Sequence, residues 1–277
     1  MSSFQPKQIT HYRAEDLEEL QGNVTEVGIE YSLDLLPPFS EGDEIHDNAC
    51  GFGAVTERIM NLNPPAIHIC ATDINTQFVQ DCDEIAKRNN WPVSSAVMSA
   101  QELTFRDNRF THSFTTFAFH CIGDHDAAAR QVYRTLKPGG TAIASVWTRM
   151  PLVDVMQHAH WLTRGREGPM PVLVPLEEFQ ESDLTGALEA GGFKSKDITC
   201  YTRECFLTIA DPRRWAQLAW SYLGKLPNGW SQGDEDKWDE ALADIVEQLG
   251  RSGRGISKNE KGEIVLTMVA CIAIAKK

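Results

Sequence analysis

Apolar residues in the first half of the chain fall into short runs that alternate with segments of helical spacing. At the start, apolar positions three and four apart predict helices over 15–20 and 25–36. Beyond them, strands are expected over 45–50, 66–71, 93–98, 112–119 and 141–147, and helices over 54–62, 76–89 and 127–136. Strands that alternate with helices in this way predict a parallel, doubly wound α/β sheet.

The second half of the chain follows a looser pattern. Its periodicity predicts helices over 176–190, 212–223 and 234–249, and strands over 196–200 and 264–275. Pro138-Gly139-Gly140 is expected to end the helix over 127–136 before the strand over 141–147 begins. With the five earlier strands, these predictions give a sheet of seven.

Charge and cysteine usage exclude several classes of protein. The formal net charge of −13 argues against a nucleic-acid partner, because phosphates are bound by clustered Lys and Arg. The seven cysteines form no Cys-x-x-Cys pattern, which favours reduced thiols in the cytoplasm. Residues 1–20 hold no apolar signal core, and the longest apolar run, 265–275, is too short to cross a bilayer. We therefore expect a soluble cytoplasmic protein without a nucleic-acid or membrane partner, of unknown oligomeric state.

A glycine-rich turn follows the first predicted strand. Gly51 and Gly53 lie between that strand and a helix, so backbone N–H groups at the helix start can face a ligand that approaches closely. Asp73 ends the next strand, where a carboxylate accepts hydrogen bonds from the ribose hydroxyls of an adenosine ligand. This order of elements, a strand, a glycine turn, a helix and a second strand that ends in Asp, predicts a nucleoside-type cofactor.

A nicotinamide cofactor is the first alternative. Residues 49–54 have the spacing of a degenerate dinucleotide fingerprint, and Tyr133 and Lys137 have the spacing of a dehydrogenase acid–base pair. However, Lys137 immediately precedes Pro138, which places the pair at a helix end. A cation that stabilises the carboxyl end of a helix explains Lys137 better.

Three motifs carry a resemblance to a known family. Asp47-Asn48-Ala49-Cys50-Gly51-Phe52-Gly53 resembles the first motif of class I methyltransferases that use S-adenosylmethionine (SAM), Asp-x-Gly-x-Gly-x-Gly. Residues 99–110 resemble the segment that holds the adenine in this family, and Leu136-Lys137-Pro138-Gly139-Gly140 matches the turn before its fifth strand. The resemblance extends over 44–147. In two departures, Ala49 replaces the first glycine and Ser99 replaces the Asp that usually binds the adenine amino group.

The resemblance implies a cofactor, SAM, and the residues that bind it. Residues 48–53 would line the methionine half of SAM, and Asp73 would bind its ribose. Positions after the second, third and fourth strands would contact its adenine and its methyl group. The implied cofactor-binding residues are Asn48, Ala49, Gly51, Gly53, Asp73, Ile74, Ser99, Ala100, Gln101, Thr116 and Phe117.

The methyl acceptor is expected to be a small molecule. The variant first motif and the region of Trp147 resemble fungal secondary-metabolite methyltransferases, including gliotoxin-type enzymes that S-methylate dithiols. Trp147, Trp161 and Trp215 are candidates for an aromatic acceptor pocket. His120, just after the fourth strand, is the candidate catalytic base. No metal is expected, because no Cys or carboxylate completes a ligand set near His158 and His160.

The architecture that the resemblance implies is one class I methyltransferase domain over 1–277, with a Rossmann-like seven-stranded sheet whose last strand is antiparallel. It comprises a helical lead-in over 1–40, a SAM-binding core over 41–149, an acceptor-binding and cap region over 150–263 and a final strand over 264–277. The leading hypothesis is methylation of a small molecule, with sulfur favoured over oxygen as acceptor. The alternative is a methyltransferase-like regulatory protein that binds SAM or protein partners without small-molecule turnover.

Overall fold

The computed structural model describes residues 7–9 and 13–277, and the chain divides into two compact units. The first unit comprises Met1–Val24, Arg149–Glu178 and Glu204–Val269. The second unit comprises Thr25–Thr148, Phe179–Arg203 and Ala270–Lys277. No helix in the described part of the chain has both the length and the apolar character needed to cross a membrane.

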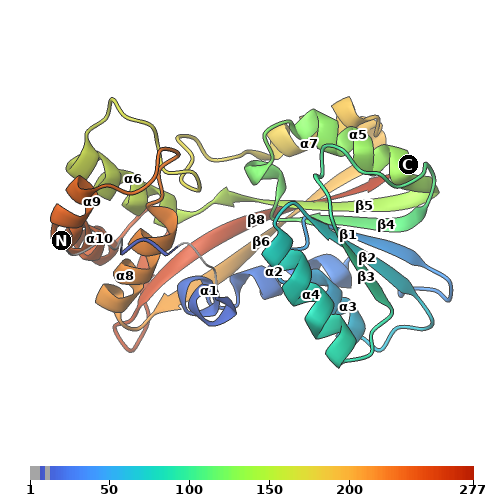
Figure 1. The fold of residues 1–277 in the computed structure, drawn as a ribbon, viewed down its shortest axis with the longest axis horizontal. Helices are drawn as coiled ribbons and strands as arrows, with labels where there is room; N and C mark the ends of the chain where they lie inside the picture. The colour runs from blue at the N-terminus through green and yellow to red at the C-terminus, as the bar shows by residue number, and fades with distance from the viewer. Residues whose placement is uncertain (1–6, 10–12) are drawn as a thin grey trace, which may run out of the picture. The chain divides into compact units, whose positions relative to one another are not determined.

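The sheet is doubly wound, as expected, and its last strands are antiparallel. Its strand order is β3-β2-β1-β4-β5-β8-β6 (Figure 1). The short β7 pairs with β8 in antiparallel fashion. The strands are β1 Glu44–Asn48, β2 His68–Asp73, β3 Val93–Val97, β4 Phe110–Thr116, β5 Leu136–Arg149, β6 Ile198–Ile209, β7 Ile256–Lys258 and β8 Ile264–Lys276. The order reverses between β1 and β4, and ligands of such sheets bind at the carboxyl ends of the strands at this point.

Helices follow most of the strands. In the second unit they are α2 Val24–Asp34, α3 Ala54–Asn61, α4 Thr76–Arg88, α5 His125–Thr135 and α7 Glu181–Gly191, with 3-10 turns at Phe119–Cys121 and Ser195–Asp197. In the first unit they are α1 Ala14–Gln21, α6 Pro151–Arg164, α8 Pro212–Leu223, α9 Gln232–Asp236 and α10 Trp238–Gly250.

Several sequence predictions were wrong at the element ends. The expected stop at Pro138-Gly139-Gly140 lies inside β5, because the Gly139 N–H donates to the Lys277 carbonyl and the Lys277 N–H to the Gly140 carbonyl. Helix α7 begins at Glu181 and not at residue 176, because Gln180 and Asp183 form a capping box. The helix expected over 234–249 is split into α9 and α10, and α6 and β7 were not predicted.

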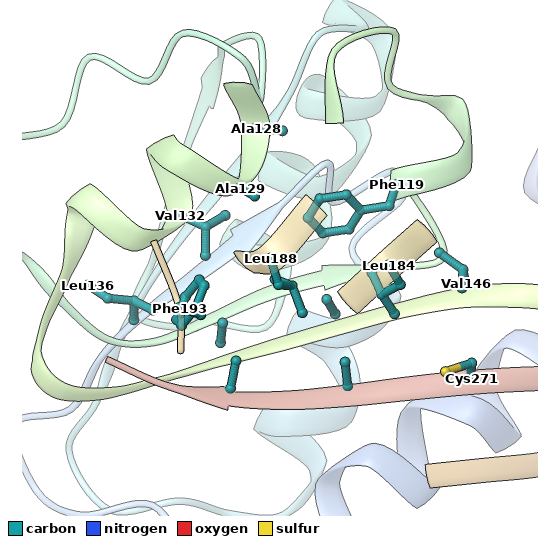
Figure 2. Packing of buried hydrophobic residues seen from close by; sticks show 14 of the residues in the cluster. Phe119, Ala128, Ala129, Val132, Leu136, Val146, Leu184, Leu188, Phe193 and Cys271 are labelled. Carbon is teal, nitrogen blue, oxygen red and sulfur yellow. The ribbon is translucent and has the colours of Figure 1, made fainter. Parts of the chain in front are cut away.

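The close packing of α5 against α7 forms a large part of the core of the second unit. Ala128 and Ala129 are fully buried on α5, and Leu184 and Leu188 are fully buried on α7 (Figure 2). Small side chains let the two helices approach each other closely. At the end of α7, a Cβ added to Gly191 would lie 2.6 Å from the Ala129 carbonyl carbon.

We therefore expect Gly191→Ala to destabilise the protein by about 1–3 kcal/mol, because the added methyl group overpacks a rigid contact. Gly186→Ala, in the same helix, is the matched control, since its Cβ would meet nothing within 4 Å. That variant should raise the free energy of unfolding by up to about 1 kcal/mol through helix propensity. Urea denaturation monitored by circular dichroism measures both, and equal effects of the two variants would contradict this packing.

Candidate active site

The glycine turn between β1 and α3 has an unusual backbone. Ala49, Gly51 and Gly53 all lie in the left-handed region, with φ of 56°, 53° and 86°. Glycine adopts this conformation freely, but an L-residue such as Ala49 pays roughly 1–2 kcal/mol for it. The turn is also closely packed, because a Cβ on Gly53 would lie 2.8 Å from the Cys82 Sγ. The departure of Ala49 from the family motif is therefore a point of backbone strain.

Asp47 joins the end of β1 to the first turn of α3. Its side chain is buried, and its Oδ2 accepts hydrogen bonds from the Thr56 hydroxyl (2.7 Å) and the Thr56 N–H (3.2 Å). Burial raises the pKa of Asp47 to about 6, although the bonds from Thr56 oppose the shift and nearby Asp73 adds to it. Asp47 therefore titrates close to neutral pH.

Asp73 lies at the end of β2 and holds the glycine turn in place. Its Oδ2 accepts the Gly51 N–H at 3.0 Å, and its Oδ1 accepts the Asn75 N–H at 2.8 Å. Each carboxylate oxygen accepts two hydrogen bonds, so both can still receive a ribose hydroxyl. In the described part of the chain, neither Asp73 nor Asp47 forms an ion pair with a cation. The site thus places two carboxylates near each other without a compensating charge.

An exposed apolar residue and a polar loop follow these strands. Ile74, which directly follows the buried Asp73, is 73% exposed. Beyond β3, the Ser99 hydroxyl accepts the Gln101 N–H at 3.2 Å, and the Gln101 side-chain oxygen accepts the Asp124 N–H at 2.6 Å. Ala100, between them, packs against the core as a partly buried residue.

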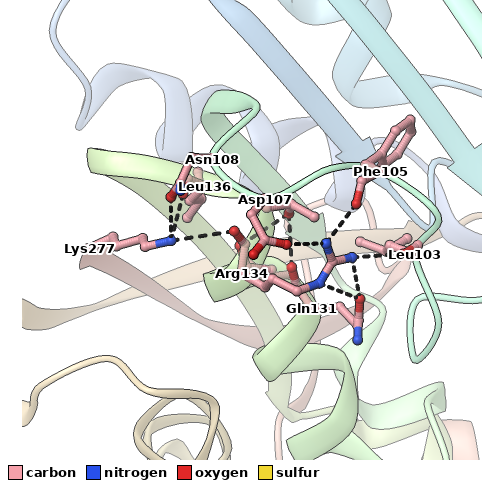
Figure 3. A network of polar contacts seen from close by, with 10 residues as sticks. Leu103, Phe105, Asp107, Asn108, Gln131, Arg134, Leu136 and Lys277 are labelled. Atoms are coloured by element: carbon pink, nitrogen blue, oxygen red, sulfur yellow. Dashed lines mark hydrogen bonds and ion pairs between the residues drawn. The ribbon is translucent and has the colours of Figure 1, made fainter.

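Arg134 of α5 fixes the segment that follows this loop (Figure 3). Its Nη1 donates to the Phe105 carbonyl (2.6 Å) and to Asp107 (2.7 Å). Its Nη2 donates to the Leu103 carbonyl (2.7 Å). Because guanidinium donors have fixed directions, these bonds give residues 103–107 one conformation. The sequence did not reveal this role of Arg134.

Phe117, just after β4, is the second strained residue near the strand ends. Its φ is 51°, an outlier for a bulky side chain, and its N–H donates to the Ser145 hydroxyl at 3.0 Å. Its ring stacks on Trp147, with centroids 4.1 Å apart and 9° between the planes. On α2, a Cβ on Gly28 would lie 2.5 Å from the Phe117 ring. Strain held by this many contacts is typical of functional sites.

Three buried polar atoms of this region lack a hydrogen-bond partner among the described residues: Asn48 Oδ1, Thr116 Oγ1 and His120 Nδ1. Asn48 and Thr116 end β1 and β4, which are paired in parallel, and His120 follows in the 3-10 turn at 119–121. Burial lowers the pKa of His120 to about 4, with a further contribution from His125. An unpartnered buried polar atom is costly, so these residues fit a polar ligand at the strand ends.

Known proteins resemble this chain in sequence and in fold. Residues 46–144 match the family model described as the methyltransferase domain. The chain carries a SAM-dependent methyltransferase domain. It is of class I, which confirms that part of the resemblance.

Three known methyltransferases are similar to this chain in sequence. Methyltransferase tpcH of Aspergillus fumigatus is 25% identical over 218 residues, which cover 75% of each chain. Methyltransferase ktnA of Aspergillus niger is 21% identical over 268 residues, or 84% of each chain. The ubiquinone/menaquinone biosynthesis C-methyltransferase UbiE of Bartonella bacilliformis is 28% identical over 124 residues, which cover 43% of this chain and 48% of the bacterial one.

Two solved structures resemble the fold of the methyltransferase. A putative methyltransferase from Bacillus halodurans has a TM-score of 0.60 at 14% identity, covering 91% of this chain and 99% of that one. Geranyl diphosphate methyltransferase in complex with SAM has a TM-score of 0.51 at 12% identity, covering 91% and 85%. At these identities, the likeness concerns the fold alone.

The predicted acceptor residues of the methyltransferase fall in both units. Trp147 is buried in the second unit against Phe117. In the first unit, Trp215 is 3% exposed and its Nε1 donates to the Leu20 carbonyl at 2.9 Å, which gives it a place in the core. Trp161 is partly exposed beside the Arg166 guanidinium. Their contact with an acceptor stays a prediction.

Metal-ligating side chains come together at two places that the sequence did not suggest: Glu44, His68 and Cys70, and Glu181, Cys200 and Cys271. In the first group, Arg109 donates to the Cys70 Sγ at 2.9 Å, and this positive charge disfavours a cation there. His158 pairs with Asp244 at 2.8 Å.

The strain at Ala49 leads to a test. Ala49→Gly should raise the free energy of unfolding by roughly 0.5–1 kcal/mol, because about 1–2 kcal/mol of strain is relieved against about 0.4–1 kcal/mol of added unfolded-state entropy. Gly51→Ala is the matched control, since its added Cβ meets nothing within 4 Å and only its φ of 53° opposes the change. It should destabilise the protein by roughly 0.5–1 kcal/mol, because about 1–2 kcal/mol of strain is added and about 0.4–1 kcal/mol of unfolded-state entropy is removed. Denaturant unfolding measures both, and destabilisation by Ala49→Gly would contradict the left-handed backbone.

Proposed function

We propose that the protein transfers the methyl group of SAM to a small organic molecule of fungal secondary metabolism, with a thiol sulfur as the favoured acceptor. The observation that carries this proposal is the pair of buried carboxylates, Asp47 and Asp73, at the glycine turn. The reduced state of all seven cysteines is compatible with a cytoplasmic location, which belongs to the same proposal.

The charge of the site favours SAM over a nicotinamide dinucleotide. SAM carries a sulfonium and an ammonium group against one carboxylate, whereas a dinucleotide places a diphosphate at the glycine turn. Asp47 precedes that turn directly and bonds to the first turn of α3, so ionised Asp47 attracts the first ligand and repels the second. The left-handed turn also leaves room for close approach to the backbone.

We assign the cofactor to the residues around this turn. Asp73 would receive the ribose hydroxyls on the free lone pairs of its oxygens, and exposed Ile74 would pack on the adenine. The unpartnered oxygens of Asn48 and Thr116 would accept hydrogen bonds from polar groups of the methionine half. The proposed site is completed by residues of the turn, of the loop after β3 and of the end of β4: Ala49, Gly51, Gly53, Ser99, Ala100, Gln101 and Phe117.

The relatives support a small acceptor. Both Aspergillus methyltransferases align with three quarters or more of this chain, beyond the 46–144 segment of the family model. The bacterial relative is named for ubiquinone and menaquinone biosynthesis, whose products are small molecules. Trp147, which stacks on Phe117 within the second unit, remains a proposed aromatic acceptor contact.

The electrostatics of His120 support a thiol over a hydroxyl. SAM supplies an electrophilic methyl group, and catalysis consists mainly of alignment and exclusion of water. A hydroxyl acceptor needs a base whose pKa is near the working pH. His120, with a pKa lowered to about 4, is neutral at pH 7 but a weak base. A thiol with a pKa of about 8.5 is already partly ionised at that pH.

Calorimetry tests the cofactor. SAM should bind and NAD should not, and SAM affinity should fall with acidification. In the free protein Asp47 has a raised pKa of about 6 and is protonated below it. A cationic ligand favours the ionised form, so the dissociation constant for SAM should be about tenfold weaker at pH 5 than at pH 7.

Asp47→Asn is the matched control for this titration. Its amide oxygen can still accept from Thr56, but it has no charge to lose, so SAM affinity should vary little between pH 5 and pH 7. Binding of NAD without SAM would overturn the cofactor assignment. If SAM affinity depended on pH in Asp47→Asn as it does in the wild type, the titration of Asp47 would not be its cause.

The pH dependence of turnover tests the acceptor. With a benzylic dithiol as acceptor, whose sulfurs are bonded to saturated carbon, kcat/KM should rise about tenfold per pH unit up to the pKa of the acceptor thiol, about 8.5. His120→Asn should show the same profile, because His120 stays neutral across this range. The phenol of the same carbon skeleton is the control and should be a poor acceptor. Turnover of phenols but not thiols, lost in His120→Asn, would refute the sulfur preference and leave the methyltransferase assignment standing.

A further inference from the structure

A pocket of about 310 Å³ lies entirely within the first unit. Its lining includes Thr163 and Arg164 at the end of α6, Asn228 and Trp230 in the loop before α9, and Asp234 and Lys237 at α9. This volume is at the lower end of the range of small-molecule sites. None of these residues takes part in the proposed cofactor site.

Arg164 is the central group of this pocket. Its side chain is nine-tenths buried, and its Nε donates to Asp234 at 2.6 Å while its Nη1 donates to the Gly224 carbonyl at 2.9 Å. The guanidinium lies over the rings of Trp220 and Trp230, at 4.6 and 5.2 Å from their centroids. Stacking and the ion pair thus hold the guanidinium plane in one orientation.

The Nη2 of this guanidinium has no hydrogen-bond partner in the described part of the chain, although it is buried. Two of its neighbours share this condition, Trp220 at Nε1 and His160 at Nε2. Because the His160 Nδ1 faces the Arg164 Nη1 at 3.5 Å and acts as the acceptor, its Nε2 carries the proton. All three unpartnered atoms are therefore donors, and a donor of this kind is satisfied by an oxygen acceptor.

The charges of the lining favour an anionic acceptor group. Both oxygens of Asp234 are engaged, Oδ1 by Arg164 and Oδ2 by the backbone N–H and hydroxyl of Ser231. Lys237 donates to the Thr163 carbonyl, and its ammonium has two more N–H groups. With two cations and one carboxylate, the pocket is positive in a chain whose net charge is −13.

We infer that this pocket binds a compact molecule with one carboxylate. A carboxylate oxygen of the ligand accepts a hydrogen bond from the Lys237 ammonium, and the Arg164 guanidinium in the pocket wall adds its positive charge. The apolar body of the ligand lies against Trp230. A monocyclic acid fits the small volume. This binding is independent of the proposed methyl transfer and requires no SAM.

Calorimetry on the full-length protein with sodium benzoate tests this site. Benzamide, which is similar in shape but uncharged, is the matched ligand control and should bind at least about tenfold more weakly, since charge-assisted hydrogen bonds are the stronger ones. Lys237→Met keeps much of the aliphatic stem and removes the charge, so it should weaken benzoate binding about tenfold. Lys225→Met, at an exposed residue outside the lining, should leave it unchanged.

Arg164→Gln is a secondary variant, because it leaves Asp234 buried without its cation, which destabilises the fold of the unit. Three results would overturn the inference. The first is no saturable benzoate binding up to about 10 mM, a concentration above the dissociation constants of ordinary weak complexes. The others are equal affinities for benzamide and benzoate, or equal benzoate affinities of Lys237→Met and the wild type. SAM affinity, measured on the same samples, should be unchanged in Lys237→Met, so failure here is distinguishable from failure of the cofactor assignment.

Discussion

The proposed cofactor site depends on two carboxylates at the ends of neighbouring parallel strands. Asp47 binds the first turn of α3 through Thr56, and Asp73 binds the glycine turn through the Gly51 N–H. These bonds hold the backbone in a left-handed path that even Ala49 must follow. Burial of two charges without a cation is unfavourable for the free protein. Under the proposed assignment, the same charges would become favourable when cationic SAM binds, so the cost in stability would be the source of cofactor selectivity.

Sequence patterns predicted the elements of the core because their signals are local. The strand, the glycine turn and the helix around Gly51 were found within a few residues of their ends, since periodicity and turn chemistry agree there. The segment Pro138-Gly139-Gly140 shows where local signals fail. Its composition predicts a turn, but pairing with Lys277 at the far end of the chain draws it into β5. A prediction from neighbouring residues cannot include this pairing, because its two partners are far apart in the sequence.

The candidate site was predictable in its residue types and less so in its geometry. The motif located Asp73, and the strand ends located Thr116 and Phe117, because parallel strands bring their carboxyl ends to one edge. The strained φ of Phe117 and its stack on Trp147 depend on Gly28 and Ser145, which are distant in sequence. The shifted pKa of Asp47 likewise arises from burial, which only the folded chain defines.

Charge also decides which acceptor the site can activate. The burial that raises the pKa of Asp47 lowers that of His120, because a low dielectric penalises the charged form of either group. A site built this way holds a cationic cofactor well but provides only a weak base. Under the proposed function, the acceptor would ionise largely by itself, as a thiol does near neutral pH. The low dielectric that we propose favours SAM through Asp47 would then also restrict the chemistry of the methyl acceptor.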